Sequence, residues 1–592
     1  MESFIARRGR VVPLGADRFL IGTRGAVLDA DAYLARLWES MDRFRTPDEQ
    51  AAYLARRGWE PDPSLADAVR ELREGGLLYG SGAILSKLRE AGGAGATDAD
   101  SAPRFAAWLT RGRPQLAARS VVSFMGACGG SAPEIRVFDD TPDGSDLPRL
   151  SAELERARAA GHAPAAPVIL CADRPAVARW CETLASRAGA PRDLVGFAVN
   201  GTGDGFWRCG GPRNLVLLSA VGRPFLLNDD DTCFGLRAPG ADNERRLLIT
   251  SRFDCLETRY PEDMDRIRGL PCAPLSPVDA HGRLLGRRVS DCLDIGRTEL
   301  GDADLGLAEL LESGTARVAV TMAGIAGHTG MESGRMVLGL RGPARDAVIR
   351  RAADYARARV SRFHVRAAAG WVVSSGAFLM APSIGLDARQ TLPPFMPVGR
   401  NDEGIFAMAL RAANPAALIG HMPYAVLHDP GPLSPFTEES LHDVRPRVAE
   451  LMTLLLLNAP PLYGAGPESR MDRLGRHLIE VSSQGAADFE ALLFELWLKQ
   501  MQGYVGFLGN LLTAYKRSPA EWAMDVDRHI QAVADQAMVE HPVSPRDVPG
   551  EPDAAFTAAQ GVIRRYGELL TAWPALRAAA PGIEEPLMRP LP

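Results

Sequence analysis

The sequence predicts an α/β protein with a largely parallel sheet, helices on both of its faces, a small N-terminal winged-helix domain and an α-helical C-terminal domain. In the central part, apolar β-prone runs alternate with helical patterns, as they do where helices cross over between parallel strands. Short strands and three short helical patterns precede this part, and long helical patterns follow it. We therefore expect four units, at residues 1–91, 104–270, 271–432 and 433–592.

The composition indicates a globular protein and gives no support for nucleic-acid binding through bulk charge. The chain has 592 residues, of which 46% are apolar, and it carries 67 basic and 73 acidic side chains. This length and apolar content suffice for several cores. A formal net charge of -6 does not attract a polyanion.

Cysteine usage and the absence of targeting signals predict a cytoplasmic protein without a transmembrane segment. The eight cysteines form no C-x-x-C pair, so we expect reduced thiols rather than disulfides or a zinc knuckle. The N-terminal residues lack the apolar core of a secretory signal. The stretch closest to a membrane span, residues 492–512, contains Glu495 and Lys499 and is typical of an amphipathic helix.

In the N-terminal unit, the clearest local signal is the start of the second helix. Thr46 is followed by a proline and, three residues later, by Glu49, which is the arrangement of a capping box. The third helical pattern carries an apolar stripe and stops at Gly75. Strands and three helices in so short a segment predict a winged-helix domain, and the glycine-rich residues 92–103 are the expected linker.

In the central part, the residues that follow apolar strands are the candidates for function, because ligands of such sheets bind beyond the carboxyl ends of the strands. Asn228 and the acidic triplet Asp229-Asp230-Asp231 directly follow the apolar run at 224–227. Three adjacent carboxylates repel one another unless a cation lies between them. Mg²⁺ is typically held by carboxylates together with substrate phosphates, so the triplet predicts a divalent-metal site for Mg²⁺ or Mn²⁺. The alternative is an acidic turn on the surface.

With the helix before it, the triplet resembles the central segment of GT-A-fold glycosyltransferases, especially glycosyltransferase family 2. The shared pattern is a glycine-rich turn, Arg-Asn, an apolar helix, an apolar strand and D-x-D, here GPRNLVLLSAVGRPFLLNDDDT. Upstream, a T-x-x-R-P signature and a strand with an acidic end follow in the family's order. The resemblance implies that a nucleotide-sugar donor contacts eight residues, namely Thr110, Arg113, Asp139, Asp140, Arg213, Asn214, Asp229 and Asp230. It also implies that Asp229 and Asp231 are the D-x-D carboxylates for ribose and metal.

Two downstream pieces extend the resemblance. Family members place an acidic residue at the start of a helix under the acceptor site, where it removes the proton of the attacking hydroxyl. Asp402 and Glu403 occupy this place; the sequence leaves open which is the base, and an ordinary helix cap is the alternative. Many GT-A enzymes also supply a late histidine to the metal, which implies His428, with His421 as second choice. A structural histidine is the alternative there.

The N-terminal unit, with its pattern DAVRELREGGLLYG, resembles PqqD-like domains, which bind leader peptides of ribosomally made natural products as an added strand. That resemblance implies a precursor peptide as acceptor. A scaffold or a DNA-type winged helix is the alternative. The segment HTGMESGRM at 328–336 is either an acceptor loop or a plain turn.

Together these features predict a metal-dependent glycosyltransferase of the hexosyltransferase class. It would move a sugar from a nucleotide-sugar to a hydroxyl of a precursor peptide or an envelope saccharide, and the family implies inversion. The alternative is a catalytically silent GT-A scaffold that binds a leader peptide for partner enzymes. A nucleotidyltransferase would need a glycine-rich phosphate loop after the first strand, where this chain has T-x-x-R-P. The C-terminal helices would form a homodimer or cover the acceptor site, and their proline-rich tail is expected to be poorly ordered.

Overall fold

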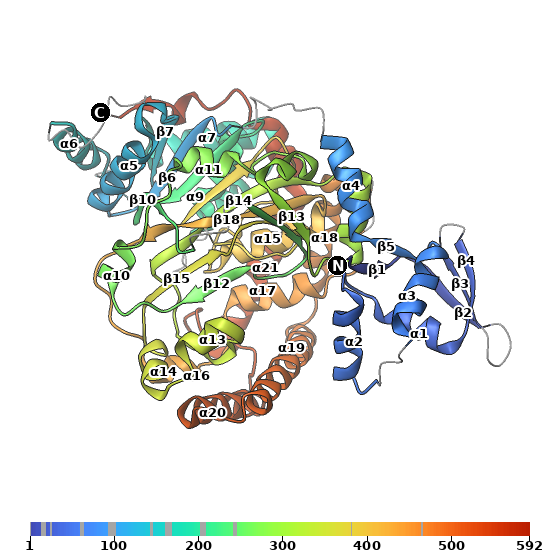
Figure 1. Cartoon of the computed structure of the whole chain (residues 1–592). Coiled ribbons are helices and arrows are strands. Elements are labelled where there is room, and N and C mark those ends of the chain that lie inside the picture. Colours follow the sequence, from blue (N-terminus) through green and yellow to red (C-terminus); the bar gives the residue numbers. More distant parts are fainter. Residues whose placement is uncertain are drawn as a thin grey trace.

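The computed structural model describes most of the chain as a mixed α/β protein (Figure 1). The described residues are 2–13, 19–23, 26–59, 64–92, 102–142, 146–159, 169–201, 209–240, 245–380, 382–462, 464 and 466–591. Most of the expected linker lies outside them. None of the helices within these ranges combines the length and the apolar character that crossing a bilayer demands.

The N-terminal unit combines two small antiparallel sheets with helices. Its strands are β1 (Phe4–Ala6), β2 (Arg10–Pro13), β3 (Phe19–Thr23), β4 (Ala26–Ala30) and β5 (Leu78–Gly80), paired as β1-β5 and β2-β3-β4. Its helices are α1 (Ala32–Ser40), α2 (Pro47–Arg56), α3 (Leu65–Glu74) and α4 (Ser81–Gly92). The capping box at Thr46 and Glu49 is confirmed, with both of its hydrogen bonds present, and α3 ends at Gly75 as expected.

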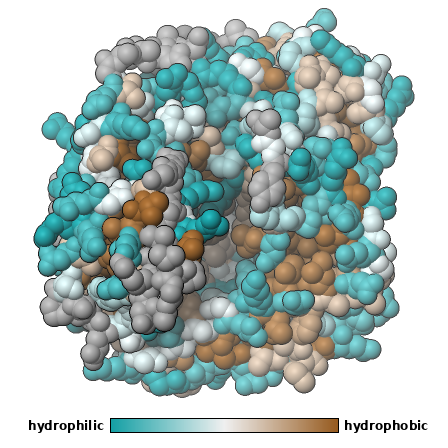
Figure 2. Space-filling model, turned by 90° about the vertical axis from the view of Figure 1, so that its right-hand side faces the viewer, coloured by the Kyte–Doolittle hydropathy of each residue, from teal (hydrophilic) through white to brown (hydrophobic). Residues whose placement is uncertain are grey.

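The N-terminal unit lies at one side of the large sheet in Figure 1. It is held there by hydrogen bonds from Phe44 N to Ala303 O (3.1 Å) and from Tyr79 Oη to Glu312 Oε2 (2.9 Å). Figure 2 views the molecule from this side, where patches of hydrophobic residues alternate with hydrophilic ones.

The centre of the molecule is a mixed sheet with 14 strands among the described residues. Its main path runs in the order β13-β11-β16-β18-β14-β17-β9-β6-β7-β8-β19, and β10, β12 and β15 pair beside it. The strands of the first half are β6 (Phe105–Thr110), β7 (Glu134–Asp139), β8 (Ile169–Ala172), β9 (Pro224–Asp229), β10 (Thr232–Arg237), β11 (Arg246–Thr250) and β12 (Leu256–Arg259). Those that follow are β13 (Arg297–Leu300), β14 (Arg317–His328), β15 (Phe363–Ala368), β16 (Trp371–Ser374), β17 (Ser383–Asp387), β18 (Ala417–His428) and β19 (Arg589–Pro590).

The sheet is less parallel than the sequence predicts. β6 to β9 run parallel to one another, but β17 is antiparallel to both β9 and β14. The strand–helix alternation on which the prediction rests is interrupted at 363–387, where β15, β16 and β17 follow one another without a helix between them. Each of these three strands pairs antiparallel with a strand elsewhere in the chain, β15 with β14, β16 with β18 and β17 with β9.

The first half of the sheet contains a point where the strand order reverses. From β6 the chain adds β7 and then β8 on one side, and it returns to place β9 on the other side of β6. The connecting helices are α5 (Pro114–Cys128), α6 (Asp146–Ala159), α7 (Arg174–Ala188), α8 (Arg192–Asn200) and α9 (Gly210–Ser219). In α/β sheets such a reversal opens a crevice at the carboxyl ends of the two central strands. The crevice expected here lies between the ends of β6 and β9.

Shorter helices follow in the second half of the central part. They are α10 (Met264–Arg268), α11 (Pro277–Gly282), α12 (Leu305–Ser313), α13 (Gly342–Val348), α14 (Ala352–Ala358) and α15 (Asp402–Ala413). Between β17 and α15, residues 388–401 form no helix or strand, yet most of them are buried.

The C-terminal part is helical, as predicted. Its helices are α16 (Glu438–His442), α17 (Val448–Leu457), α18 (Pro467–Val481), α19 (Ala486–Ala514), α20 (Ala520–Ala537) and α21 (Pro552–Ala579). α21 lies against the irregular segment before α15: Tyr566 Oη donates to Pro394 O (2.9 Å) and Trp573 Nε1 donates to Leu392 O (2.8 Å). The tail differs from the expectation, because β19 extends the sheet by pairing antiparallel with β8.

Candidate functional site

Two arginines and six acidic or hydroxyl side chains meet at the carboxyl ends of β6 and β9, where the strand order predicts a crevice. Thr110 is the last residue of β6 and Asp229 the last of β9, and the two strands are paired up to Leu109 and Asp229. The acidic triplet therefore turns over the end of the sheet before β10 begins at Thr232. Parallel strands bring their carboxyl ends to one edge, which is why residues more than a hundred positions apart lie together here.

Arg113 binds the second and third carboxylates of the triplet. Its Nη2 lies 2.5 Å from Asp230 Oδ1 and its Nη1 lies 3.0 Å from Asp231 Oδ2. Thr110 Oγ1 donates to the other oxygen of Asp230 at 3.0 Å. Burial raises the pKa of Asp230 to about 7, although Arg113 works in the opposite direction. Since about half of the Arg113 side chain is exposed, this guanidinium can also reach a ligand in the crevice.

Arg213 binds the first carboxylate of the triplet and the acidic pair of α15 at the same time. Its Nη1 lies 2.5 Å from Asp402 Oδ2 and 3.0 Å from Glu403 Oε1, and its Nη2 lies 3.3 Å from Asp229 Oδ1. The arginine is buried. It therefore acts on the acidic groups around it and is not open to a ligand, in contrast to the donor contact implied by the family pattern.

The two acids of α15 differ in their protonation. Burial raises the pKa of Asp402 to about 8, so this carboxyl holds a proton at neutral pH. Burial also opposes ionisation of Glu403, but the charge of Arg213 and hydrogen bonds to the carboxylate together outweigh it and lower the pKa of Glu403. Asp402 is almost completely buried, whereas 22% of the Glu403 side chain is exposed. Glu403 is thus the ionised and accessible member of the pair.

The backbone around the acidic pair is unusual. Asn401, which directly precedes α15, has a φ of 64°, a left-handed conformation that asparagine adopts more readily than most residues. Gly210 at the start of α9 allows a close approach, because a Cβ there would lie 1.9 Å from Met396 O and 3.3 Å from Asp402 Cβ. The sequence shows this glycine, but it gives no reason for it, since the neighbours of Gly210 come from a distant segment.

Asp231 also contacts His428, the last residue of β18. His428 Nε2 lies 3.3 Å from Asp231 Oδ1, and His428 Nδ1 lies 2.7 Å from the carbonyl oxygen of His328. Burial opposes the ionisation of Asp231, yet its contacts with His428 and Arg113 lower its pKa to about 2. Burial likewise opposes protonation of His428, but Asp231 raises its pKa. His421, the second choice, is seven residues away along β18, which is about 20 Å of strand.

Two of the side chains expected to bind a metal, Asp231 and His428, lie in contact. Within the chain segments that the structure describes, no group of three or more histidine, cysteine, aspartate and glutamate side chains is arranged to hold a metal ion. Asp231 Oδ1 is nevertheless buried and receives no well-aligned hydrogen bond. Two ligands that each lie about 2.1 Å from an octahedral cation are about 3 Å apart. The 3.3 Å between Asp231 Oδ1 and His428 Nε2 therefore fits a cation that takes its remaining ligands from a substrate or water.

The remaining expected donor contacts divide into two groups. Asp139 is the last residue of β7 and lies opposite Thr110, and the next residue, Asp140, pairs with Arg174 at 3.0 Å. These two acids border the crevice. Asn214 does not, because its side-chain amide bonds both the N–H and the carbonyl of Phe395 (2.7 and 2.9 Å). It fixes the irregular segment that leads to α15.

The segment at 328–336, expected to be an acceptor loop or a plain turn, lies beside the site. A Cβ on Gly330 would lie 3.8 Å from His428 Cε1, and Arg400 Nη2 donates to Gly330 O at 3.1 Å. Glu332 forms ion pairs with three arginines, Arg400 (3.4 Å), Arg447 (3.1 Å) and Arg546 (2.9 Å). These arginines come from different parts of the chain, so no local pattern predicts that they converge.

Comparisons with known proteins identify no relative. No protein-family model, no curated protein and no solved structure matches the chain.

Proposed function

We propose that the chain is a metal-dependent glycosyltransferase that uses a nucleotide-sugar donor. The observation that carries this proposal is the meeting of the acidic triplet and the acidic pair of α15 through Arg213, at the strand-order reversal of the sheet. A crevice of this kind suits a nucleotide. The acidic pair of α15 lies opposite the acidic triplet, which could bind a cation. This arrangement suits the activation of an acceptor hydroxyl for attack on a phosphorylated sugar.

In this proposal, each side chain has a role that follows from its position. Asp139 and Asp140 border the nucleoside end of the crevice, and Arg113 reaches the diphosphate. Asp231 and His428 would hold Mg²⁺ or Mn²⁺, which would supply neutralisation of the charge that develops on the leaving diphosphate. Glu403 accepts the proton of the acceptor hydroxyl. Arg213 is a positioning residue that keeps Glu403 ionised and directed toward the triplet.

The experiment that tests the proposal separates donor binding from turnover. Isothermal titration with UDP, GDP and their sugars, with Mn²⁺ and after chelation, measures the first. Release of nucleoside diphosphate, with and without an added acceptor, measures the second. We expect metal-dependent binding that Asp231→Asn abolishes, and that Asp265→Asn, at an exposed position of α10, leaves intact. Absence of binding by every nucleotide would refute the proposal.

The acceptor is a separate part of the proposal. We infer from the resemblance of the N-terminal unit to PqqD-like domains that a precursor peptide binds there as an added strand. Its leader would keep the modified segment near the crevice at high effective concentration. If a peptide binds the N-terminal unit while no nucleotide binds the crevice, the chain is a peptide-binding scaffold and not a transferase.

A further inference from the structure

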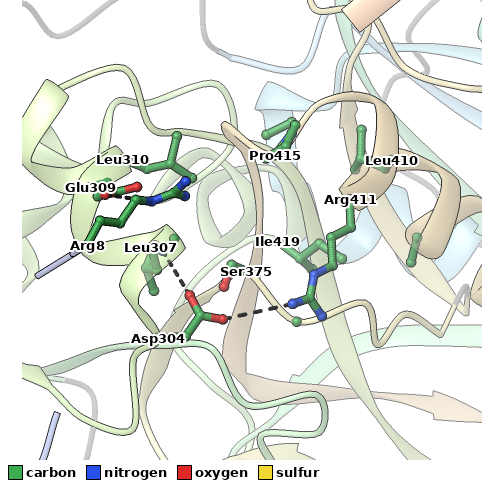
Figure 3. Close-up of a pocket in the computed structure, with 14 residues that line it drawn as sticks. Arg8, Asp304, Leu307, Glu309, Leu310, Ser375, Leu410, Arg411, Pro415 and Ile419 are labelled. Atoms are coloured by element: carbon green, nitrogen blue, oxygen red, sulfur yellow. Dashed lines mark hydrogen bonds and ion pairs between the residues drawn. The ribbon is translucent and has the colours of Figure 1, made fainter. Parts of the chain in front are cut away.

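A second hollow lies at the far end of α15 from the acidic pair. It is a cavity of about 450 Å³, a size typical of small-molecule sites. The later turns of α15, with Leu410 and Arg411, form one wall, and α12 forms the wall that faces it (Figure 3). Leu410 is seven residues from Glu403, which is about 10 Å along the helix axis. The cavity is thus distinct from the crevice between β6 and β9.

The cavity lies at the carboxyl ends of a second set of parallel strands. β13, β11 and β16 are mutually parallel, and the chain beyond each of them contributes a polar residue, Asp304, Ser251 and Ser375 in that order. Ser251 Oγ accepts hydrogen bonds from Asp304 N (3.0 Å) and from Ser375 Oγ (2.9 Å). Ligands of α/β sheets bind at this end of parallel strands. The position and the polar cluster indicate a built site rather than a packing gap.

The walls of the cavity are largely apolar, and its charged side chains form two ion pairs. The apolar side chains come from both helices and from the start of β18, namely Leu307, Leu310, Leu410 and Ile419. Arg8 of the N-terminal unit pairs with Glu309 at 2.9 Å. Arg411 and Asp304 face each other more loosely, with 3.9 Å between Nη2 and Oδ2, which is beyond hydrogen-bond distance. Figure 3 shows this pair directed toward each other across the hollow.

This balance of charges selects the kind of ligand. A simple anion would meet the carboxylates of Asp304 and Glu309, and a simple cation would meet the guanidinium groups of Arg8 and Arg411. A zwitterion has no such conflict, because each of its charges finds an opposite partner. Arg411 and Asp304 lie 3.9 Å apart. A ligand that carries an ammonium and a carboxylate group on neighbouring atoms can therefore form charge-assisted hydrogen bonds of about 2.8 Å to both side chains.

We propose that this cavity binds a free α-amino acid with an apolar side chain. Its carboxylate contacts Arg411, its ammonium group contacts Asp304, and its side chain packs between the leucines of α12 and α15. The proposal is independent of the proposed transferase activity, since it involves neither the crevice nor a nucleotide.

The first test uses the unmodified full-length protein and four probes. Isothermal titration compares L-leucine with glycine, N-acetyl-L-leucine and L-leucinamide, which lack the side chain, the ammonium charge and the carboxylate, respectively. We expect saturable binding of L-leucine and at least about tenfold weaker binding of each other probe, because each loses a charged hydrogen bond or the apolar contact. If L-leucine does not bind, or binds no more tightly than N-acetyl-L-leucine and L-leucinamide, the proposal is wrong.

Two variants then locate the site. Arg411→Gln should weaken L-leucine about tenfold and leave L-leucinamide unchanged, because the amide does not use the guanidinium charge. Asp304→Asn should weaken L-leucine and leave N-acetyl-L-leucine unchanged. Asparagine can still cap α12, where Asp304 Oδ1 accepts from Leu307 N. The control is Arg473→Gln, an exposed position of α18. Binding that neither cavity variant alters would place the amino acid elsewhere and overturn the assignment.

Discussion

Replacement of Arg213 by methionine should destabilise the protein in a way that depends strongly on pH. Arg213 is buried and is the shared cation of Asp229, Asp402 and Glu403. Removal of one partner from a buried ion pair typically costs about 3–5 kcal/mol, because a charge stays buried without compensation. Methionine is similar in length to arginine, so the free energy lost through poorer packing is small compared with this electrostatic cost.

The sign of the pH dependence follows from the carboxyl groups that remain. Without Arg213 the pKa values of these carboxyl groups rise, and those of Asp229 and Asp402 already lie above the unfolded value of about 4, so the folded variant binds more protons than the unfolded chain. A carboxyl group whose pKa is higher in the folded than in the unfolded protein stabilises the folded state at pH values below its unfolded pKa. This stabilisation is lost as the pH rises toward the folded pKa. Each additional proton that the folded state retains costs about 1.4 kcal/mol per pH unit. Between about pH 5.5 and pH 8 one such proton accounts for about 3 kcal/mol.

The assay is urea unfolding followed by tryptophan fluorescence at these two pH values. The free energy of unfolding of Arg213→Met should be lower than that of the wild type by several kcal/mol at about pH 8 and by much less at about pH 5.5. Arg473→Met, at an exposed position of α18, is the control and should cost little at either pH. An equal deficit at the two pH values would refute the view that Arg213 is needed for its charge.

Three further predictions address the site. Glu403→Gln should lower the rate of sugar transfer by about 10²–10⁴ with little change in donor affinity, as measured by turnover beside titration; a normal rate would remove Glu403 as the base. Gly210→Ala should cost about 1–3 kcal/mol in urea unfolding, because its Cβ would overlap Met396 O, whereas Gly126→Ala in α5, where a Cβ meets no neighbour within 4 Å, should be neutral or stabilising. Glu332→Gln should speed amide hydrogen exchange in residues 329–334 by releasing three arginines; unchanged exchange would show that these ion pairs do not order the loop.

Local patterns in the sequence predicted the elements well where the physical cause is itself local. The capping box of α2 and the end of α3 depend on neighbouring residues, and both are present. The alternation of strands and helices likewise predicted an α/β protein with a helical C-terminal part. The antiparallel β17 and the added β19 depend on which distant segments meet at a sheet edge, and no local pattern specifies that.

The same distinction applies to the site. Asp229, Asp230 and Asp231 could be singled out because a strand's carboxyl end is recognisable from an apolar run followed by polar residues. The ion-pair partners of these aspartates could not be predicted, because the tertiary structure decides which carboxylates lie next to Arg113 and Arg213. The sequence also left Asp402 and Glu403 equivalent. The structure separates them, because Asp402 is buried with a raised pKa whereas Glu403 is partly exposed with a lowered one.

The contacts of α21 bear on how this protein can be divided into fragments. Trp573, Tyr566 and Arg577 donate hydrogen bonds to backbone carbonyls of the buried, irregular segment 388–394. A fragment that stops near residue 432 would leave these carbonyls without donors, at about 1–3 kcal/mol for each that stays buried. We therefore expect that residues 104–432 do not fold when expressed alone, because α21 supplies hydrogen-bond donors that the sheet-bearing part needs.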